Sequence, residues 1–149
     1  MKKIKFIKWL KLFFIKLARA RDSTTEIALG AGIGAFISVF PTFGFGMPLV
    51  ILLNKFIKFN LISALALSTI SNPFTSPFFM VLSYKVGAAI LKTKIEFNLE
   101  NWKENISNTS LVLLFGSIIV SGIMSLLVYF TTKIIVEKYR KRYYIKKQV

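Results

Sequence analysis

Two long apolar runs in the middle of the chain are each interrupted near their centres. The first covers residues 27–58 and is broken over 41–48, and the second covers residues 61–91 and is broken over 71–77. Proline inside a helix removes a backbone hydrogen bond and clashes with the preceding turn. The pattern therefore predicts two apolar helical segments, each broken by a proline-containing motif.

The start of the first segment carries signals for a helix that packs closely against another. Ser23 followed by Glu26 has the spacing of a capping box. Gly30 and Gly34 lie four residues apart, which puts them on one face of the helix. Such spacing lets a second helix approach the backbone, so we expect close helix packing here.

The break in the first segment contains Pro41, Gly44 and Pro48. The glycine permits a tight turn between the two helical pieces. The first piece, residues 24–40, is near the lower limit of about 17–25 residues for a membrane span, and the second, residues 49–59, is too short to cross comfortably. The segment is therefore either a thin-walled hairpin or a re-entrant loop. Both alternatives return the chain to its starting side, and Asn60 then turns it into the next segment.

The break in the second segment contains Asn72, Pro73, Thr75, Ser76 and Pro77. Its prolines leave helix carbonyls without donors, which costs several kcal/mol each in hydrocarbon unless other groups satisfy them. Ser76 followed by Pro77 resembles an N-cap and a first-turn proline. The new helix would direct the positive end of its dipole into the membrane interior.

Two interpretations of these breaks remain open. Two half-helix N-termini at depth would favour an anionic group, and paired interrupted segments point to a transporter site. The polar contacts of that site would be Thr42, Asn72, Thr75 and Ser76. In the other interpretation the breaks are kinks that shape packing and bind nothing.

The remaining sequence flanks this core with basic ends and one further apolar run. The first 21 residues place large apolar side chains opposite lysines, which is typical of a helix lying in the membrane interface. Ser117, Ser121 and Ser125, with Gly122 beside them, predict a packing stripe of small residues on the last run. The predicted parts are an interfacial helix (1–21), a core membrane domain (24–92), an extracytoplasmic loop (93–110), a straight transmembrane helix (111–136) and a basic cytoplasmic tail (137–149).

Together with this pattern, composition and charge predict an all-α integral membrane protein with about four membrane segments. Hydrophobic residues make up 54% of the 149 residues, above the roughly 45–50% of soluble domains. The net charge of +15 is concentrated at the two ends, which predicts that both termini are cytoplasmic. A nucleic-acid binder would instead carry such charge on a folded polar surface, so we expect no nucleic-acid partner.

The chain lacks the residues of most catalytic and metal sites. It has no Cys and no His, and its six acidic residues lie outside the apolar runs. Acid–base catalysis and metal binding rely on such side chains at a shielded position. We therefore expect neither an enzyme nor a cofactor or metal.

The core domain resembles the bacterial membrane-protein family called domain of unknown function 2062. The residues that carry the resemblance are Glu26, Ala28, Gly30, Gly34, Pro41, Gly44, Asn60, Asn72, Pro73, Thr75, Pro77, Tyr84 and Gly87. They lie within residues 24–92, about half of the chain. The resemblance implies a protein of the bacterial cytoplasmic membrane, in some cases joined to or near glycosyltransferase-type enzymes of the cell envelope, and implies no specific activity.

Two functions fit these observations. The first is transport or handling of an anionic lipid carrier or envelope precursor at the broken helices, where the short chain would need a homo-oligomer to form a pathway. The second is a non-catalytic scaffold or anchor for a cell-envelope enzyme. In both cases the expected partners are membrane lipids and their anionic headgroups.

Overall fold

The computed structural model describes residues 22–42, 44–69, 75–92 and 102–148, with side chains placed for 109–142 of the last range. These residues form five helices and no strand: α2 (Thr24–Val39), α3 (Gly46–Asn54), α4 (Leu61–Ser68), α5 (Ser76–Leu91) and α6 (Trp102–Gln148). The all-α prediction is confirmed for this part of the chain. The predicted interfacial helix, Asn72 and Pro73 lie outside the described residues.

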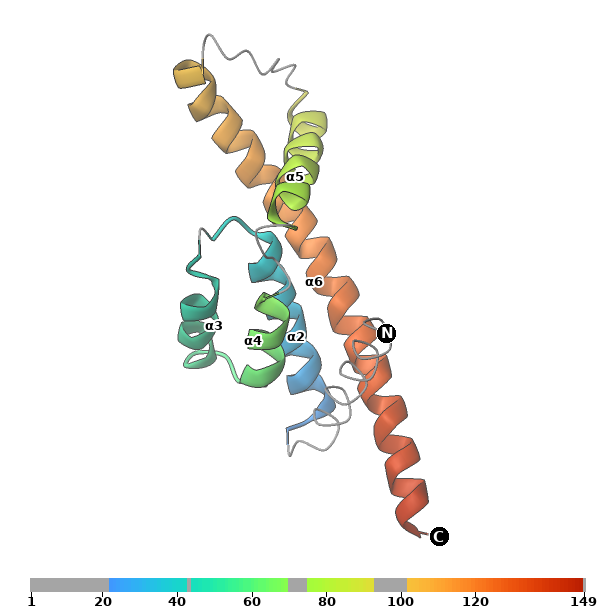
Figure 1. Cartoon of the computed structure of the whole chain (residues 1–149). Coiled ribbons are helices and arrows are strands. Elements are labelled where there is room, and N and C mark those ends of the chain that lie inside the picture. The colour runs from blue at the N-terminus through green and yellow to red at the C-terminus, as the bar shows by residue number, and fades with distance from the viewer. Residues whose placement is uncertain (1–21, 43, 70–74, 93–101, 149) are drawn as a thin grey trace, which may run out of the picture.

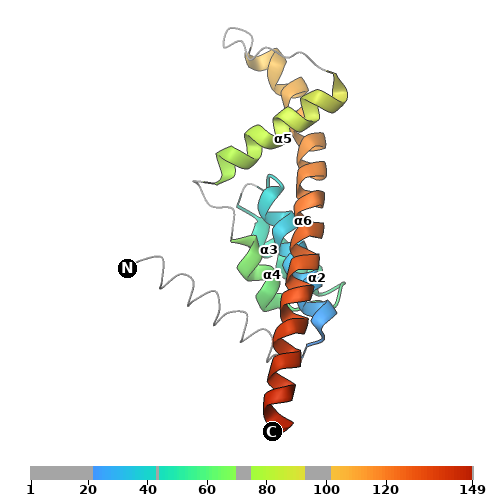
Figure 2. The same cartoon turned by 90° about the vertical axis from the view of Figure 1, so that its right-hand side faces the viewer.

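The long helix α6 is the axis on which the other helices are arranged. Helix α2 lies beside its C-terminal half, α4 packs on α2, and α5 lies beside its N-terminal half (Figure 1). Figure 2 shows that α5 crosses α6 obliquely, whereas α2 runs beside it. Helix α3 packs on α4 and α2, on the side away from α6.

Helix α6 extends beyond the predicted straight span of residues 111–136 in both directions. It begins at Trp102, inside the predicted loop, and continues to Gln148, through most of the predicted tail. The prediction placed the helix ends where the apolar run ends, but polar and charged residues such as Glu, Lys and Arg are good helix formers. The apolar section of α6 ends while the helix itself continues.

Glycines on α2 allow α4 to pack against its backbone. A Cβ atom on Gly30 would overlap the carbonyl oxygen of Asn60 and the hydroxyl of Ser63. A Cβ atom on Gly34 would overlap the carbonyl oxygen of Ala64. The predicted close packing at these two glycines is therefore confirmed, and their partner is α4.

The small residues of α6 also form helix contacts, with one correction to the predicted stripe. Ser117 and Ser121 are buried, and the Ser125 hydroxyl donates to the carbonyl oxygen of Gly32 over 2.9 Å. Gly122 instead faces open space, because no atom lies within 4 Å of an added Cβ. The glycine that allows close packing is Gly116, which lies against α5.

Helices α5 and α6 approach each other so closely that neither Gly116 nor Gly87 has room for a side chain. A Cβ atom on Gly116 would overlap the carbonyl oxygen of Ser83. On the other helix, a Cβ atom on Gly87 would overlap the carbonyl oxygen of Val112. The two backbones are thus in direct contact where α5 crosses α6.

The N-terminus of α2 is held by a polar cluster. The predicted capping box is present: the Glu26 backbone N–H donates to the Ser23 hydroxyl, and the Ser23 N–H donates to the Glu26 carboxylate. Glu26 also pairs with Lys58 at 3.2 Å. The Ser23 backbone N–H, followed by Lys58, lowers the pKa of the Glu26 carboxyl below its usual value. Glu26 is therefore a structural residue that ties α2 to the turn before α4.

Asn60 and Arg140 complete this polar cluster. The Asn60 side chain donates to the Asp22 carboxylate and accepts from the Ser63 backbone N–H at 2.7 Å, which caps α4. Arg140, on α6, donates to the carbonyl oxygen of Asp22 over 2.6 Å and to the Thr24 hydroxyl over 3.2 Å. The cluster joins α2, α4 and α6 at one end of the molecule.

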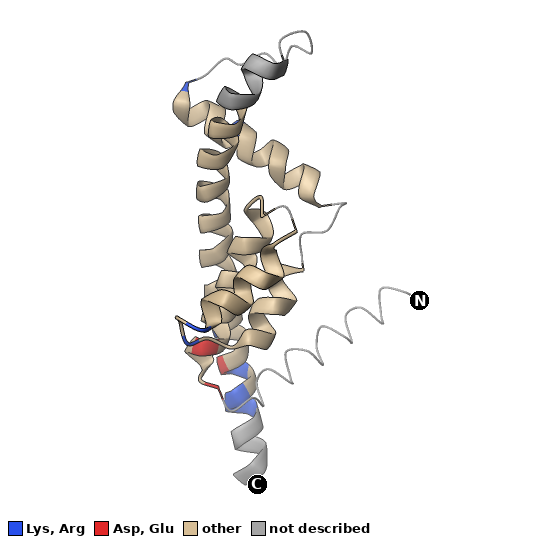
Figure 3. Cartoon of the chain, turned by 90° about the vertical axis from the view of Figure 1, so that its left-hand side faces the viewer, with Lys and Arg blue, Asp and Glu red and all other residues tan. Residues whose placement is uncertain are grey.

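One helix of the described chain is long and apolar enough to cross a membrane, by length and composition: the part of α6 from Thr109 to Arg142. Helices α2 and α5 are apolar but shorter, at 16 residues each. Large apolar side chains on the outer face of α6 are exposed, including Ile134 at 62%. Most of the charged residues drawn in colour in Figure 3 lie near the end where the polar cluster is found.

Candidate functional site: a pocket between the two helix breaks

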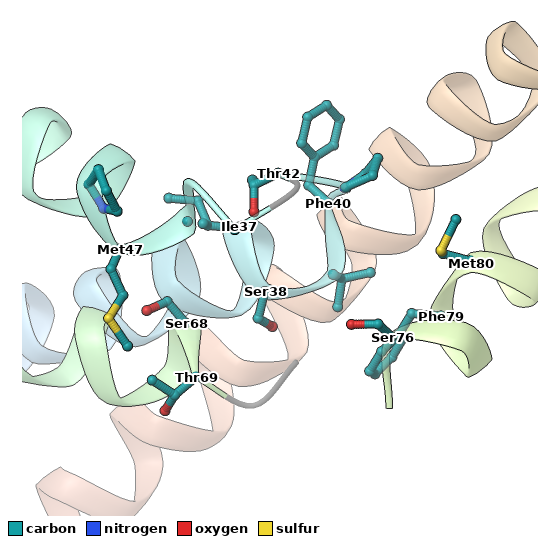
Figure 4. Close-up of a pocket in the computed structure, with 15 residues that line it drawn as sticks. Ile37, Ser38, Phe40, Thr42, Met47, Ser68, Thr69, Ser76, Phe79 and Met80 are labelled. Carbon is teal, nitrogen blue, oxygen red and sulfur yellow. The ribbon is translucent and has the colours of Figure 1, made fainter. Parts of the chain in front are cut away.

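The structure places the first predicted break and Ser76, near the end of the second, around one pocket. Its volume is about 580 Å³. The walls come from the end of α2, the first break, the start of α3, the end of α4 and the start of α5 (Figure 4). Figure 1 shows that these helix ends lie midway along α6, far from the polar cluster.

The first break forms a compact turn between α2 and α3. The helix α2 ends at Val39, and Phe40 takes an extended conformation. The Thr42 backbone N–H donates to the carbonyl oxygen of Phe40 over 2.8 Å, and the Phe45 N–H donates to that of Thr42 over 2.9 Å. Gly44 has φ +93°, which other residues rarely adopt, so the turn requires glycine at this position.

The second break leads into α5. The helix begins at Ser76, with Pro77 in its first turn and Thr75 as its N-cap. The predicted N-cap was Ser76, so the prediction was wrong by one residue, although Pro77 occupies the first turn as predicted. Proline is tolerated in the first turn because the first N–H groups of a helix have no partner within the helix.

Five hydroxyl groups line the pocket, and three of them are already committed as donors. Ser38 donates to the carbonyl oxygen of Ala35 over 2.9 Å, Ser68 to that of Leu65 over 2.9 Å, and Thr69 to that of Ala66 over 2.7 Å. A hydroxyl has one proton, so these three oxygens can only accept hydrogen bonds from a ligand in this arrangement. The hydroxyls of Thr42 and Ser76 also line the pocket, and Ser76 makes an interaction of its own.

Thr42 and Ser76 lie on different walls of the pocket. The Thr42 hydroxyl lies beside Gly46, where it would be 3.2 Å from an added Cβ atom. The Ser76 hydroxyl points from α5 toward the wall on which Ser38 lies (Figure 4). Charged side chains do not occur among the described residues of the lining, which is otherwise apolar. The electrostatic character of the pocket therefore depends on hydroxyl groups and helix ends.

The predicted polar residues divide between the pocket and its surroundings. Thr42 and Ser76 line the pocket, Thr75 occupies the N-cap position of α5 without a side-chain cap hydrogen bond, and Asn72 lies outside the described residues. Pro41, Gly44 and Pro48 also line it. The other residues that carried the family resemblance act elsewhere: Gly30, Gly34 and Gly87 at helix contacts, Glu26 and Asn60 in the polar cluster, and Tyr84 half-buried on α5.

Sequence reasoning missed Ser38 and Ser68. Each lies in the last turn of an apolar helix just before a break, and each lines the pocket. Single hydroxyl residues in apolar helices commonly bond to their own backbone, so neither stood out. Their position before a break is the signal that could have identified them.

The described residues contain no group of three or more His, Cys, Asp or Glu side chains that could hold a metal ion. The described lining of the pocket offers apolar side chains and hydroxyl groups to a ligand. Hydroxyl groups and helix termini suit a polar head, and the apolar side chains around them suit a hydrocarbon tail.

Comparison with known proteins gave one match. No curated protein and no solved structure matches the chain. The family described as an uncharacterised protein conserved in bacteria, domain of unknown function 2062, matches residues 7–144. The match is wider than the resemblance within residues 24–92, since it takes in α6 as well. The chain belongs to this bacterial family.

Proposed function

We propose that this protein is a multi-pass protein of the bacterial cytoplasmic membrane with both termini in the cytoplasm. The apolar section of α6 has the length to span a bilayer, and its outer side chains are exposed. Lys58 and Arg140 lie in the polar cluster at one end, where most of the Lys and Arg residues coloured in Figure 3 gather, and basic residues favour the cytoplasmic side. In this arrangement α4 and α5 together form a second, broken crossing, and α2 with α3 returns to its starting side.

Within that membrane, the protein handles an anionic lipid carrier or envelope precursor at the pocket. The observation that carries this proposal is the meeting of the first break with the start of α5 around one cavity midway along α6. Pocket volumes of about 300–1,000 Å³ are typical of ligand sites, and 580 Å³ falls within that range. A cavity bounded by exposed apolar side chains suits a lipid head whose chains remain in the bilayer.

The helix N-termini at the pocket support an anionic head. Helices α3 and α5 both begin at the lining, at Gly46 and Ser76. The first turn of a helix carries partner-free N–H groups and a partial positive charge of about half a unit. The described lining contains no carboxylate to repel an anion. The absence of His and Cys from the sequence supports a binding role over a catalytic one.

Analysis of the lipids that accompany the purified protein tests this function. The protein is extracted in mild detergent, its lipids are identified by mass spectrometry, and the Thr42→Val/Ser76→Ala double variant is compared with it. We expect one class of anionic lipid to be enriched over the membrane extract and to be reduced in the variant. Thr131→Val is the matched control, because Thr131 bonds to its own helix on the exposed surface of α6. Equal lipid content in wild type and double variant would contradict the proposal.

A scaffold for a cell-envelope enzyme is the second candidate, and the surface of α3 favours it. Phe45 and Phe56, at the two ends of α3, are 71% and 80% exposed. Such residues can face lipid or a partner protein. Loss of an enzyme partner in Phe56→Ser, with the lipid content unchanged, would support the scaffold over the lipid-handling function.

A further inference from the structure

Two lysines interrupt the apolar surface of α5. Lys85 lies in the second half of the helix, and Lys92 is the C-cap at its end. Both residues are exposed. A charged side chain within an apolar helix is rare in membrane proteins, where it requires a partner or an aqueous layer within reach.

Lys85 lies on the face of α5 that points away from α6. On the opposite face, Ser83 lies against Gly116. Gly87 lies against Val112 on that face as well. Lys85 is two residues from both Ser83 and Gly87, which in an α-helix places it about 200° around the axis from each. The Lys85 side chain is therefore directed toward the surroundings of the protein.

The second half of α5 carries side chains that are typical of a membrane interface. Tyr84 precedes Lys85, and tyrosine is enriched at the interface. Lys85 and Lys92 are separated by two helical turns, about 10 Å along the axis, and the difference in depth is smaller because α5 is oblique to α6 (Figure 2). Long lysine side chains extend their charge toward the headgroups. Both ammonium groups can therefore reach the same headgroup layer, which is extracytoplasmic in the proposed topology.

The same face of α5 offers apolar contacts closer to the start of the helix. Val81 is one turn and Phe78 is two turns before Lys85, and they are 56% and 65% exposed. In the proposed arrangement α5 begins inside the membrane, so these side chains lie deeper than the lysines. Apolar side chains at depth and cations at the surface match the acyl chains and the phosphate of one phospholipid.

Charge distinguishes a lipid from a second copy of the chain as the occupant of this face. The acidic side chains that the structure describes are those of Asp22, Glu26 and Glu137, and Figure 3 shows the acidic residues toward the end away from α5. A two-fold interface places the same surface patch of each copy against the other. Such an interface through this face would bring the lysines of the two copies together, whereas an anionic lipid would neutralise them.

We infer that this face of α5 binds an anionic phospholipid of the extracytoplasmic leaflet. The phosphate lies at Lys85 and Lys92, and the acyl chains lie along Phe78 and Val81. The surface is separate from the pocket, whose described lining contains no residue of α5 beyond Met80. The inference rests on the proposed membrane arrangement and is independent of the lipid handled at the pocket.

Quenching of a fluorophore by nitroxide-labelled lipids measures the lipid preference of this face. The chain has no cysteine, so Ala89→Cys, at an exposed position one turn after Lys85, provides a single site for a bimane label. The full-length protein is reconstituted in mixed vesicles in which either phosphatidylglycerol or phosphatidylcholine carries the nitroxide. A lysine near a membrane surface favours an anionic lipid about fivefold, so two lysines should give a preference for phosphatidylglycerol of at least about tenfold.

The Lys85→Gln/Lys92→Gln variant tests whether the two lysines cause this preference. We expect the preference at residue 89 to fall toward unity in this variant. It should persist in Lys138→Gln/Lys141→Gln, which removes the same charge from exposed positions in the C-terminal half of α6. A label at Ile118→Cys is a second control, because Ile118 is exposed and no charged residue occurs in residues 105–132. The two lipids should quench that label equally.

Four results would overturn the inference. The first is equal quenching by the two lipids at residue 89, and the second is an unchanged preference in Lys85→Gln/Lys92→Gln. The third is weak quenching by both lipids at residue 89 with strong quenching at residue 118, which would show that a protein surface covers this face of α5. The fourth is the absence of quenching at both residues, which would contradict the proposed membrane arrangement as well.

Discussion

The Gly34→Ala variant sets the helix propensity of alanine against the steric overlap that its methyl group makes with α4. Replacing glycine by alanine within a helix stabilises it by about 1 kcal/mol when the new methyl group has room. At Gly34 the new Cβ atom would lie 2.9 Å from Leu67 Cβ and 3.0 Å from the carbonyl carbon of Ala64, and closer still to the Ala64 oxygen. Non-bonded carbon atoms prefer about 3.5–4.0 Å, so α4 must move away from α2.

The balance of these effects gives a net loss of stability. Overpacking of this kind costs about 1–3 kcal/mol. The Ala64 atoms that oppose the new methyl group belong to the backbone, which cannot turn aside as a side chain can, so we use the upper half of that range, about 2–3 kcal/mol. After the propensity gain of about 1 kcal/mol, we expect Gly34→Ala to be destabilised by about 1–2 kcal/mol. Gly122→Ala is the matched control: nothing lies within 4 Å of its Cβ, so it should gain up to about 1 kcal/mol.

Thermal unfolding in mild detergent, followed by far-ultraviolet circular dichroism, measures the difference. For a chain of this size each kcal/mol shifts the midpoint by about 2–4 °C, so the two variants should differ by roughly 4–12 °C. Gly34→Ala should also bind less lipid, because moving α4 displaces Ser68 from the pocket. A midpoint for Gly34→Ala equal to or above that of Gly122→Ala would refute the packing of α2 on α4.

Three further predictions concern the polar cluster and the membrane arrangement. Arg140→Ala loses the hydrogen bonds to Asp22 and Thr24 and should lower the free energy of unfolding by about 1–3 kcal/mol. Arg142→Ala, at an exposed position, is the control and should change it by less than about 0.5 kcal/mol. Equal thermal midpoints for the two variants would contradict the contact between Arg140 and the start of α2. Because folding lowers the pKa of Glu26, its carboxylate stabilises the fold at pH values above the usual pKa of 4.5, and this stabilisation is lost as the pH falls below that value. The thermal midpoint of Glu26→Gln should therefore depend less on pH in the acid range. An unchanged pH dependence would refute the role of the carboxylate. The chain has no cysteine, so Lys92→Cys and Lys55→Cys each provide a single label site. The cysteine at position 92 should react with an impermeant thiol reagent in intact cells, and the one at position 55 should react only after lysis. The reverse pattern would contradict the proposed topology.

The parts of the fold that sequence predicted are those set by local rules. The capping box at Ser23 and Glu26 involves neighbouring residues, and Gly30 and Gly34 mark a packing face without need of the partner's identity. The breaks followed from proline and glycine chemistry in the same way. Local sequence determines where a helix begins or can be approached closely.

The features that sequence did not predict depend on contacts between distant segments. Arg140 bonds to Asp22 and Thr24, and no local pattern connects these positions. Gly122 and Gly116 have similar surroundings in sequence, but only Gly116 faces another helix. The ends of α6 were misplaced because apolar periodicity reports the buried or lipid-facing section and not the full helix.

The pocket combines both kinds of information. The two breaks were predicted separately, and their proximity arises from the packing of α4 on α2 and of α5 on α6. Thr42 and Ser76 were candidates because they lie in the breaks, whereas Ser38 and Ser68 join them through the fold alone. The expectation of an anionic ligand came from the helix starts that the two breaks create.

Photo-crosslinking with a lipid that carries a diazirine next to its headgroup tests the lipid pocket most directly. An anionic phospholipid with this label is reconstituted with the full chain in membranes and irradiated, and the labelled peptides are sequenced by mass spectrometry. If the two breaks form one lipid site, labels will concentrate in residues 41–48 and 76–80 together, and excess unlabelled lipid will reduce both. Labels spread along the exposed face of α6, with none in the two breaks, would contradict a lipid site at this pocket.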